Sequence, residues 1–425
     1  MRPDGVLPVE LPEAVREALL APLVDHHCHG VCRDDLTRSG FETLLAETGT
    51  PAAPGTTHFD TPAGAAVRRW CAPVLGLDPH VPPAVYLARR AELGAAEVNR
   101  RLLAAAGVAA FLSDGAPGDA EVLPPAEMGR AGGAAAAEVV RIEQVEEEVA
   151  ETAASGVSYI SALAQRLAGR AAGAVALKSV TAHRSGPDPA RPSRGAVIAA
   201  AARRLADPGE RLADPVLLRH LLWTAVDVAR ETGRPLQLRT GHTACGGPGR
   251  ARDARSPLAG PGPRGPASPD GRPGGLADPG RRGRAGADLP GGGDFAPPAD
   301  LLRALQPVGV PVVLLHCRPF HRQAACLAGA LPHVYLDVGS VPTRGAAGAA
   351  AVMGELLELV PFHKQLFGSG GHGVAETCHL GAVHYRRGLA GALAARLADG
   401  EWSVADAARV AHMIGSGNAR RIYRL

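Results

Sequence analysis

The chain has 425 residues, of which 46% are hydrophobic and 20% are charged, and its formal net charge at pH 7 is +3. This length allows one large α/β barrel or two domains, and the apolar content is sufficient for a large buried core. The weak positive charge argues against nucleic acid or a membrane surface as a partner. The 7 cysteines form no C-x-x-C pair, so they indicate neither a disulfide framework nor a zinc ribbon.

Residues 1–21 are predicted to form a short amphipathic lead-in that lacks the basic and apolar regions of a signal peptide. The chain contains no run of the roughly 20 apolar residues that a membrane-spanning helix needs. A cytoplasmic protein is therefore expected.

The most informative stretch is residues 22–30, PLVDHHCHG, where a short apolar run ends in three histidines. In a β-strand, His27 and His29 would share one face, about 6–7 Å apart, while Cys28 faces the other way. Two imidazoles on one face can bind a single metal ion. An H-x-H pair in isolation is more often a solvated strand end, but its position at the end of a first strand favours metal or substrate contact. His26 is expected to be structural.

Seven further strands are predicted, each followed by a helix-compatible segment, with polar residues at the C-terminal strand ends. Their ranges are 108–115, 136–145, 174–186, 234–243, 310–320, 333–340 and 363–373. Helices are predicted at 34–47, 65–75, 84–107 and 146–169 and from residue 375 onward. This alternation predicts a parallel sheet, and eight units predict a closed (β/α)8 TIM barrel with its active site at the C-terminal face. An open doubly wound sheet is the alternative, although no G-x-G-x-x-G follows the first strand.

Residues 22–425 are thus predicted to be one barrel domain, interrupted after the fifth strand by residues 246–296. This segment is dominated by Gly, Pro, Arg and Ala and has few large apolar side chains. Such a composition cannot bury enough surface to offset the entropy cost of ordering, so a disordered insertion is expected. A tolerated insertion is the simplest interpretation, and a lid or interaction arm is the alternative.

Several motifs in a fixed order resemble the amidohydrolase superfamily, in particular its amidohydrolase-2 group and FluG-like domains. They are LVDHHCHG, VVRIEQV, LKSVTAHRSG, PLQLRTG, VVLLHCRPF, HVYLDVGS, PFHKQLFGSGGHGVAETCHL and NARRIYRL. The resemblance implies a (β/α)8 barrel that uses one or two divalent metal ions, with Zn or Mn expected, to activate water. It implies hydrolysis of amide or other C–N bonds, or a decarboxylase-like lyase reaction.

The resemblance also implies roles for single residues. His27 and His29 match a metal-binding pair, and His316 matches a metal-binding histidine after the sixth strand; a hydrogen-bonded core histidine is the alternative for His316. Lys178 matches a lysine that bridges two metals when it is carbamylated, and the alternative is a buried ion pair with Asp114 or Glu143.

His372 and Glu376 match a G-H-x-x-x-E segment that lines the pocket, which implies a catalytic role together with Lys178. The alternatives are a histidine at the pocket rim and a first-turn glutamate that complements the helix dipole.

Two departures from the FluG-like pattern fall on the metal site. Arg239 stands where that pattern has a histidine, and Gly370 stands where it has an aspartate that ligates metal and accepts the proton of water. A guanidinium about 5 Å from a divalent ion is repelled by about 5–7 kcal/mol at an effective dielectric constant near 20, and arginine does not deprotonate. Substitute ligands would have to come from the following residues: His242, Cys245, Asp25, Asp114, Glu143 and Asp337.

The substrate is expected to be a small molecule that bears a carboxylate. Arg184 and Arg239, together with Lys178, would pair with such a group, and Glu143 and His242 are further candidate substrate-binding residues. Two hypotheses follow. The first is a metal-dependent hydrolase in which His372, Glu376 or Glu143 acts as the base. The second is a catalytically degenerate barrel that binds a small anionic ligand or a protein partner without a tightly held metal. The sequence leaves a homo-oligomer open.

Overall fold

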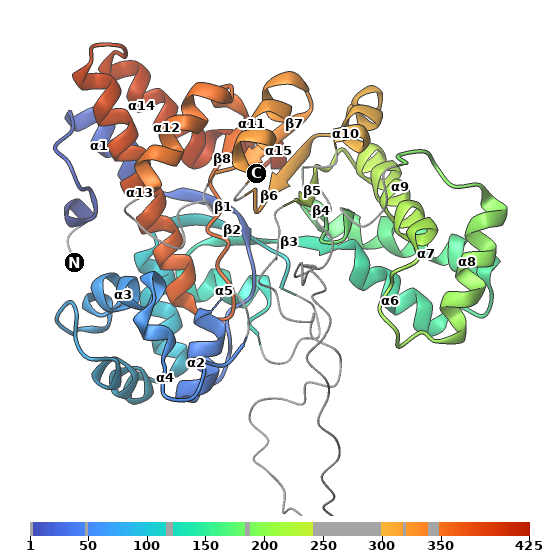
Figure 1. Cartoon of the computed structure of the whole chain (residues 1–425), viewed down its shortest axis with the longest axis horizontal. Helices are drawn as coiled ribbons and strands as arrows, with labels where there is room; N and C mark the ends of the chain where they lie inside the picture. Colours follow the sequence, from blue (N-terminus) through green and yellow to red (C-terminus); the bar gives the residue numbers. More distant parts are fainter. Residues whose placement is uncertain are drawn as a thin grey trace, which may run out of the picture.

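The computed structural model describes residues 3–46, 50–115, 122–182, 188–240, 299–317, 320–338 and 348–425. Within these ranges, eight parallel strands pair with one another in chain order, from β1 to β8 (Figure 1). They are β1 (Leu23–Cys28), β2 (Val108–Ser113), β3 (Ala135–Arg141), β4 (Ala176–Ser179), β5 (Leu236–Arg239), β6 (Val312–Leu315), β7 (Val334–Asp337) and β8 (Gln365–Leu366). Each predicted strand overlaps one of them.

Backbone hydrogen bonds between β1 and the segment that follows β8 bring the two edges of the sheet together. His26 N donates to Phe367 O at 3.2 Å, Gly370 N donates to His27 O at 2.8 Å, and His29 N donates to Gly371 O at 2.8 Å. The sheet is therefore a nearly closed barrel, and the predicted (β/α)8 TIM-barrel fold is confirmed.

Helices surround the sheet (Figure 1). They are α1 (Glu13–Leu20), α2 (Arg38–Leu45), α3 (Pro62–Ala66), α4 (Pro83–Ala105), α5 (Pro125–Gly132), α6 (Ile142–Thr152), α7 (Gly156–Gly173), α8 (Arg194–Ala206), α9 (Pro215–Thr232), α10 (Ala299–Leu305), α11 (His321–Ala330), α12 (Ala349–Leu359), α13 (Ala375–Ala398), α14 (Val404–His412) and α15 (Asn418–Tyr423). Outward-facing strand residues such as Leu177, Leu238 and Leu314 form one large apolar cluster with them. In the described ranges, none of the helices has the length and apolarity needed to cross a bilayer.

Three sequence predictions were wrong in detail. The strand predicted at 136–145 ends at Arg141, so Glu143 lies in the first turn of α6. The helix predicted at 146–169 is two helices, α6 and α7, because Ser155 caps the N-terminus of α7 through a capping box with Ser158. Helix α4 is broken at Gly94, where φ is 75° and ψ is 157°. The predicted insertion at 246–296 lies outside the described residues.

The interior of the barrel holds a second apolar cluster, to which the last helix contributes. Val24, Leu112 and Val313 point inward and pack with Ile422 and Tyr423 of α15. Helix α15 is far from β1 in the sequence but packs beside it, and its side chains fill space inside the barrel that the strand side chains leave open.

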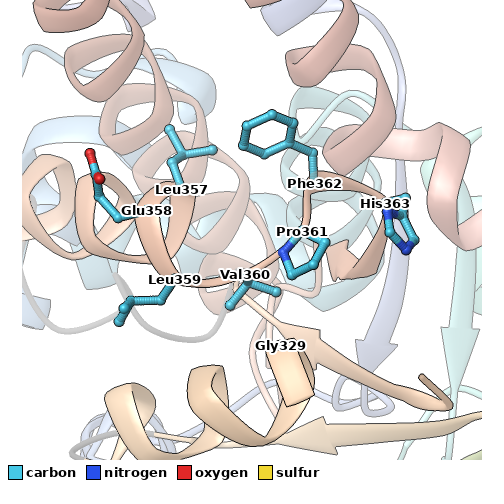
Figure 2. Close-up of a pocket in the computed structure, with 8 residues that line it drawn as sticks. All are labelled: Gly329, Leu357, Glu358, Leu359, Val360, Pro361, Phe362 and His363. Atoms are coloured by element: carbon cyan, nitrogen blue, oxygen red, sulfur yellow. The ribbon is translucent and has the colours of Figure 1, made fainter. Parts of the chain in front are cut away.

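Two surface hollows lie at the end of the barrel where the strands begin. One, of about 530 Å³, is lined by the end of α12 and by the turn before β8, including Pro361, Phe362 and His363 (Figure 2). The other, of about 340 Å³, lies between the end of α9, the segment before β6 and the C-terminal part of α15, and it includes Arg421 and Arg424. Both are at the opposite end of the strands from the histidines described next.

Candidate metal centre

Three of the predicted metal ligands come together where β1 and β6 end. His27 lies in β1, His29 follows that strand directly, and His316 follows β6, and one ring nitrogen from each lies within 4.8 Å of the others. The ring centroids of His27 and His316 are 4.6 Å apart, and those of His27 and His29 are 5.5 Å apart. Nitrogen atoms bound to one tetrahedral zinc ion lie about 3.4 Å apart, so modest side-chain rotation would bring this set onto one ion.

His316 turns into this cluster through an unusual backbone conformation. Its φ of 53° lies in the left-handed region. Such a conformation is uncommon for residues other than glycine and costs about 1–3 kcal/mol when the surroundings enforce it, and such residues concentrate at functional sites.

Carboxylates orient two of the three imidazoles. Asp337, the last residue of β7, accepts a hydrogen bond at its Oδ2 from His27 Nδ1 at 2.8 Å. Asp114, which follows β2, contacts His29 Nδ1 through its Oδ1. A histidine that donates one ring N–H to a carboxylate presents the lone pair of the other nitrogen to a metal. In the described part of the chain, His27 Nε2 is buried and has no hydrogen-bond partner, as expected for a ligand atom of an ion.

The histidines are held in the neutral form that binds metals. Burial lowers the pKa of His27 to about 3, with the charge of Lys178 adding to this effect and Asp337 opposing it. Burial likewise lowers the pKa of His29 and takes that of His316 well below its ordinary value. Neutral imidazoles are the ligand form in zinc sites, so a metal ion need not displace protons here near neutral pH.

The two orienting carboxylates stay ionised. Burial alone would raise the pKa of Asp337, but the nearby His26 ring and the hydrogen bond from His27 outweigh it and lower the pKa. Burial would also raise the pKa of Asp114, but the neighbouring His29 and Lys178 have the larger effect and hold this pKa well below its usual value. The histidine cluster is therefore flanked by two negative charges.

Lys178 forms a buried ion pair with one of them. Its Nζ lies 2.8 Å from Asp114 Oδ2, and the exposed fractions of the two side chains are 1% and 2%. The structure thus places Lys178 in the ion pair with Asp114 that the sequence had left as an alternative, and not in one with Glu143. A catalytic role for Lys178 stays a prediction.

Arg239 lies at the end of β5, paired in register with Leu315 of β6. Its charge contributes to lowering the pKa of both His29 and His316, so the guanidinium acts on the histidine cluster. Arg184 and His242, the other predicted substrate-binding residues, and Cys245 lie outside the described residues.

The two predicted glutamates have structural partners. Glu376 is fully buried and accepts hydrogen bonds from Tyr86 Oη at 2.7 Å and Arg90 Nε at 2.7 Å, which joins α13 to α4. Glu143 Oε1 accepts from Ser179 Oγ at 2.7 Å and from the backbone N–H groups of Val180 and Thr181. It thereby holds the turn after β4, so neither glutamate gains support as a catalytic base.

His372 is closer to the cluster. Its ring centroid is 6.3 Å from that of His29, and its backbone N–H donates to Thr377 Oγ1 at 2.9 Å. Two glycines build the loop before it. Gly370 has a φ of 62°, and a Cβ on Gly371 would lie 2.4 Å from Cys378 Sγ, so a side chain at that position would need a shift in the start of α13.

Sequence reasoning did not identify the carboxylate–imidazole pairs. The sequence suggests Asp337 as a substitute metal ligand and Asp114 as either such a ligand or the ion-pair partner of Lys178, whereas the structure shows both as partners of the histidines. Their position at the ends of the second and seventh strands was the available signal, because side chains at these ends converge in a barrel.

Comparison with known proteins supports the fold more strongly than any particular activity. No protein-family model matches the chain. Over 118 residues the chain is 33% identical to Protein fluG of Emericella nidulans, and this alignment covers 27% of the chain but only 14% of that protein. The chain therefore spans a small part of its curated relative.

Solved structures match over nearly the whole chain. A protein of Lactobacillus casei ATCC 334, provisionally described as a metal-dependent hydrolase, has a TM-score of 0.71 and 21% identity, with 98% of each chain covered. Glucuronate isomerase of Caulobacter crescentus has a TM-score of 0.61 and 15% identity, with 100% of this chain and 97% of that chain covered. A uronate isomerase of Bacillus halodurans C-125 has a TM-score of 0.60 and 15% identity, with 97% and 96% covered. At these identities the likeness shows a shared barrel fold.

Proposed function

We propose that the protein is a metal-dependent enzyme of the amidohydrolase type that hydrolyses a C–N bond in a small carboxylate-bearing substrate. The observation that carries this proposal is the cluster of His27, His29 and His316, in which neutral imidazoles converge and His27 Nε2 is buried without a hydrogen-bond partner in the described part of the chain. The barrel shared with a protein described as a metal-dependent hydrolase supports it.

The cluster suits zinc. Three histidines with an open fourth position are a known ligand set for catalytic zinc, and imidazole nitrogen suits zinc better than manganese. A divalent ion bound there would lower the pKa of a water molecule and polarise a substrate carbonyl. The contribution of the chain is to hold the imidazoles neutral and to fix their rings through Asp114 and Asp337.

Positive charge beside the cluster suits an acidic substrate. Arg239 adds a guanidinium, which pairs with a carboxylate through two parallel hydrogen bonds. Two of the similar barrels are named for uronates, which are sugars that carry a carboxylate, and this supports the same substrate class. Arg239 would then orient the carboxylate while the scissile bond lies toward the histidines.

His372 is the residue best placed to move a proton. Its ring is adjacent to that of His29, and a histidine accepts and releases protons near neutral pH. We assign the base to His372 in place of Glu376 and Glu143, because both glutamates are engaged in holding neighbouring turns and helices.

A second function, binding of a small anion without metal, is favoured by one specific observation. Gly370 stands where the related pattern has an acidic metal ligand, while Arg239 acts on the cluster electrostatically. In this alternative, Arg239 and Lys178 bind the anion and no metal ion is held by the histidines.

The test is the zinc content of purified protein by elemental mass spectrometry after incubation with excess Zn²⁺. The wild type is compared with His316→Asn, which removes the imidazole while keeping a side chain that tolerates a positive φ. His363→Ala is the matched control, because His363 lies in the turn before β8, at the opposite end of that strand from the histidine cluster. We expect about one equivalent in the wild type and the control, and less than about a tenth in His316→Asn.

The result that contradicts the enzyme proposal is a wild type that takes up no metal. Zinc uptake by the variant Gly370→Asp but not by the wild type would instead support the anion-binding alternative. If the wild type binds zinc, hydrolysis of N-acyl amino acids is compared with isomerisation of uronates, since the second activity would overturn the proposed C–N bond chemistry.

A further inference from the structure

A line of polar groups crosses the interior of the barrel from α15 to the histidine cluster. Tyr423 Oη lies 2.9 Å from His26 Nδ1, and His26 Nε2 lies 3.7 Å from Asp337 Oδ1. Asp337 Oδ2 in turn accepts the hydrogen bond of His27 Nδ1 at 2.8 Å. All four residues are buried. Tyr423 and His26 are 397 residues apart in the sequence, so this connection is a property of the fold.

Gln237 fixes the direction of the hydrogen bonds along this line. Its Nε2 donates to His26 O at 2.8 Å and to Tyr423 Oη at 2.9 Å. A backbone carbonyl only accepts, so the amide nitrogen must be the atom that faces it. The tyrosine oxygen accepts from Gln237, and its own buried proton is costly without an acceptor, so we assign that proton to His26 Nδ1, which lies 2.9 Å away.

This assignment also determines which ring nitrogens of His26 and His27 carry a proton. His26, which accepts at Nδ1, carries its proton on Nε2, which lies 3.7 Å from Asp337 Oδ1, an electrostatic contact beyond hydrogen-bond distance. Asp337 thus accepts a hydrogen bond from His27 at Oδ2 and has the polar N–H of His26 near Oδ1. His27 is protonated on Nδ1, which leaves the lone pair of Nε2 directed away from Asp337 and available for a ligand.

We infer that Tyr423 is a positioning residue of the metal centre: through His26 and Asp337, its hydroxyl fixes the tautomer in which His27 offers Nε2 to the metal. This inference rests on the proposed function in so far as it concerns metal binding, whereas its statement about tautomers concerns the metal-free protein. It assigns to α15, which supplies none of the three histidines, a part in building the site.

The surroundings of Tyr423 keep its hydroxyl in place. Asn418, the first residue of α15, donates to Phe362 O at 2.7 Å and to Gln365 O at 2.8 Å, which anchors the helix to the start of β8. Ile422 and the Tyr423 ring pack in the inner apolar cluster. The ring also stacks on His26, with centroids 5.8 Å apart.

Loss of the hydroxyl would remove the reason for His26 to be protonated on Nε2. Without the hydroxyl, Nδ1 has no partner in either tautomer, so the hydrogen bond that favoured protonation on Nε2 is lost, the two tautomers come closer in energy, and part of the molecules carry the proton on Nδ1. In those molecules the Nε2 lone pair would face Asp337 Oδ1, and repulsion between the two would loosen the hold of the carboxylate on His27. The expected result is weaker metal binding with the fold intact.

The test compares Tyr423→Phe with Tyr385→Phe. Tyr385 is also fully buried, and its hydroxyl has no hydrogen-bond partner in the described residues, so its removal controls for the loss of a buried phenol. Zinc affinity is measured by chelator competition, and histidine tautomers are measured by ¹⁵N–¹H correlation spectra of the metal-free, ¹⁵N-histidine-labelled proteins. The resonances of His26 and His27 are assigned with His26→Gln and His27→Gln.

We expect Tyr423→Phe to weaken zinc binding about threefold or more, below the roughly 10- to 100-fold loss typical of a direct partner of a ligand. Its His26 spectrum should show mixed tautomers, and Tyr385→Phe should match the wild type in both measurements. Unchanged zinc affinity and unchanged tautomers in Tyr423→Phe would overturn the inference.

The wild-type spectrum decides the matter even where Tyr423→Phe does not fold. It should show His26 protonated on Nε2 and His27 protonated on Nδ1, and the opposite tautomer at either residue contradicts the inference. A wild type that binds no zinc but has these tautomers would refute the proposed function alone.

Discussion

At the scale of single residues, the buried carboxylates near the histidine cluster differ in what they contact. Asp114 and Asp337 contact the histidines, whereas Glu376 is paired with Arg90 between two helices. A carboxylate held by a buried arginine is part of the packing of α13 on α4. The motif G-H-x-x-x-E therefore combines a residue near the cluster, His372, with one that supports the helix behind it.

Glu376→Gln is predicted to destabilise the protein without a specific loss of zinc. Removing one partner of a buried ion pair leaves an unpaired charge and costs about 3–5 kcal/mol, and Arg90 would be left in this state. Urea unfolding of the variant measures the cost. The double variant Arg90→Met with Glu376→Leu should recover most of it. If Glu376→Gln is as stable as the wild type but has lost activity, the predicted catalytic role of Glu376 would regain support.

The histidines and the orienting carboxylates differ in how far the sequence could identify them. His27 and His29 are two residues apart at the end of a strand, so local spacing was enough to place them together. The link between His27 and Asp337 spans 310 residues. Only the three-dimensional arrangement of β1 and β7 could show it, and the same holds for Tyr423 on His26.

At the scale of elements, short polar segments decide where helices begin and end. The capping box at Ser155 divides a stretch whose apolar periodicity alone predicts one continuous helix. Glu143 was assigned to a strand because the run before it is apolar, but its carboxylate is needed in the first turn of α6 to bind the loop after β4. Hydrogen bonds of these side chains thus determine where β3 ends and where α6 and α7 begin, which the apolar pattern of the sequence alone does not predict.

Gly94→Ala is predicted to lower the free energy of unfolding by about 1–3 kcal/mol. With φ at 75° and ψ at 157°, Gly94 occupies a region that residues with a Cβ essentially do not adopt. The break it makes lets Ala95 N donate to Asp35 Oδ1 at 2.6 Å. Thermal and urea denaturation measure the effect.

Gly169→Ala is the matched control for that variant. Gly169 lies within α7, and a Cβ there would meet open space. Alanine in a helix interior is favoured over glycine by about 0.5–1 kcal/mol, so this variant should be more stable than the wild type. If the two substitutions change the free energy of unfolding equally, the fold does not require the positive φ at Gly94.

At the scale of the whole molecule, the barrel brings strand ends that are distant in sequence to one site. The order of the eight strands follows the order of the chain, which is why alternating strand and helix patterns sufficed to predict the fold. The closure of β1 against the segment after β8 depends on backbone groups of residues such as Gly370 and Gly371. Backbone pairing of this kind leaves little trace in side-chain patterns.

Zinc is predicted to stabilise the whole barrel, because its ligands come from β1 and β6 and bind together only in the folded state. A free zinc concentration about a hundred times the Kd would add about 2.7 kcal/mol to the free energy of unfolding. Calorimetry should show a higher Tm with zinc, a return to the initial Tm with a chelator, and no response in His316→Asn. Equal stabilisation of that variant would mean that zinc binds elsewhere.

The contact between α15 and β1 has a consequence for how the protein is made. Tyr423 is translated 397 residues after His26. At synthesis rates of about 5–20 residues per second, this separation corresponds to a delay of about 20–80 s. During that time the nascent chain has His27 and His29 but not the hydroxyl that is proposed to direct the tautomer of His26. The histidine cluster therefore reaches its final arrangement only after α15 has been synthesised and has packed beside β1.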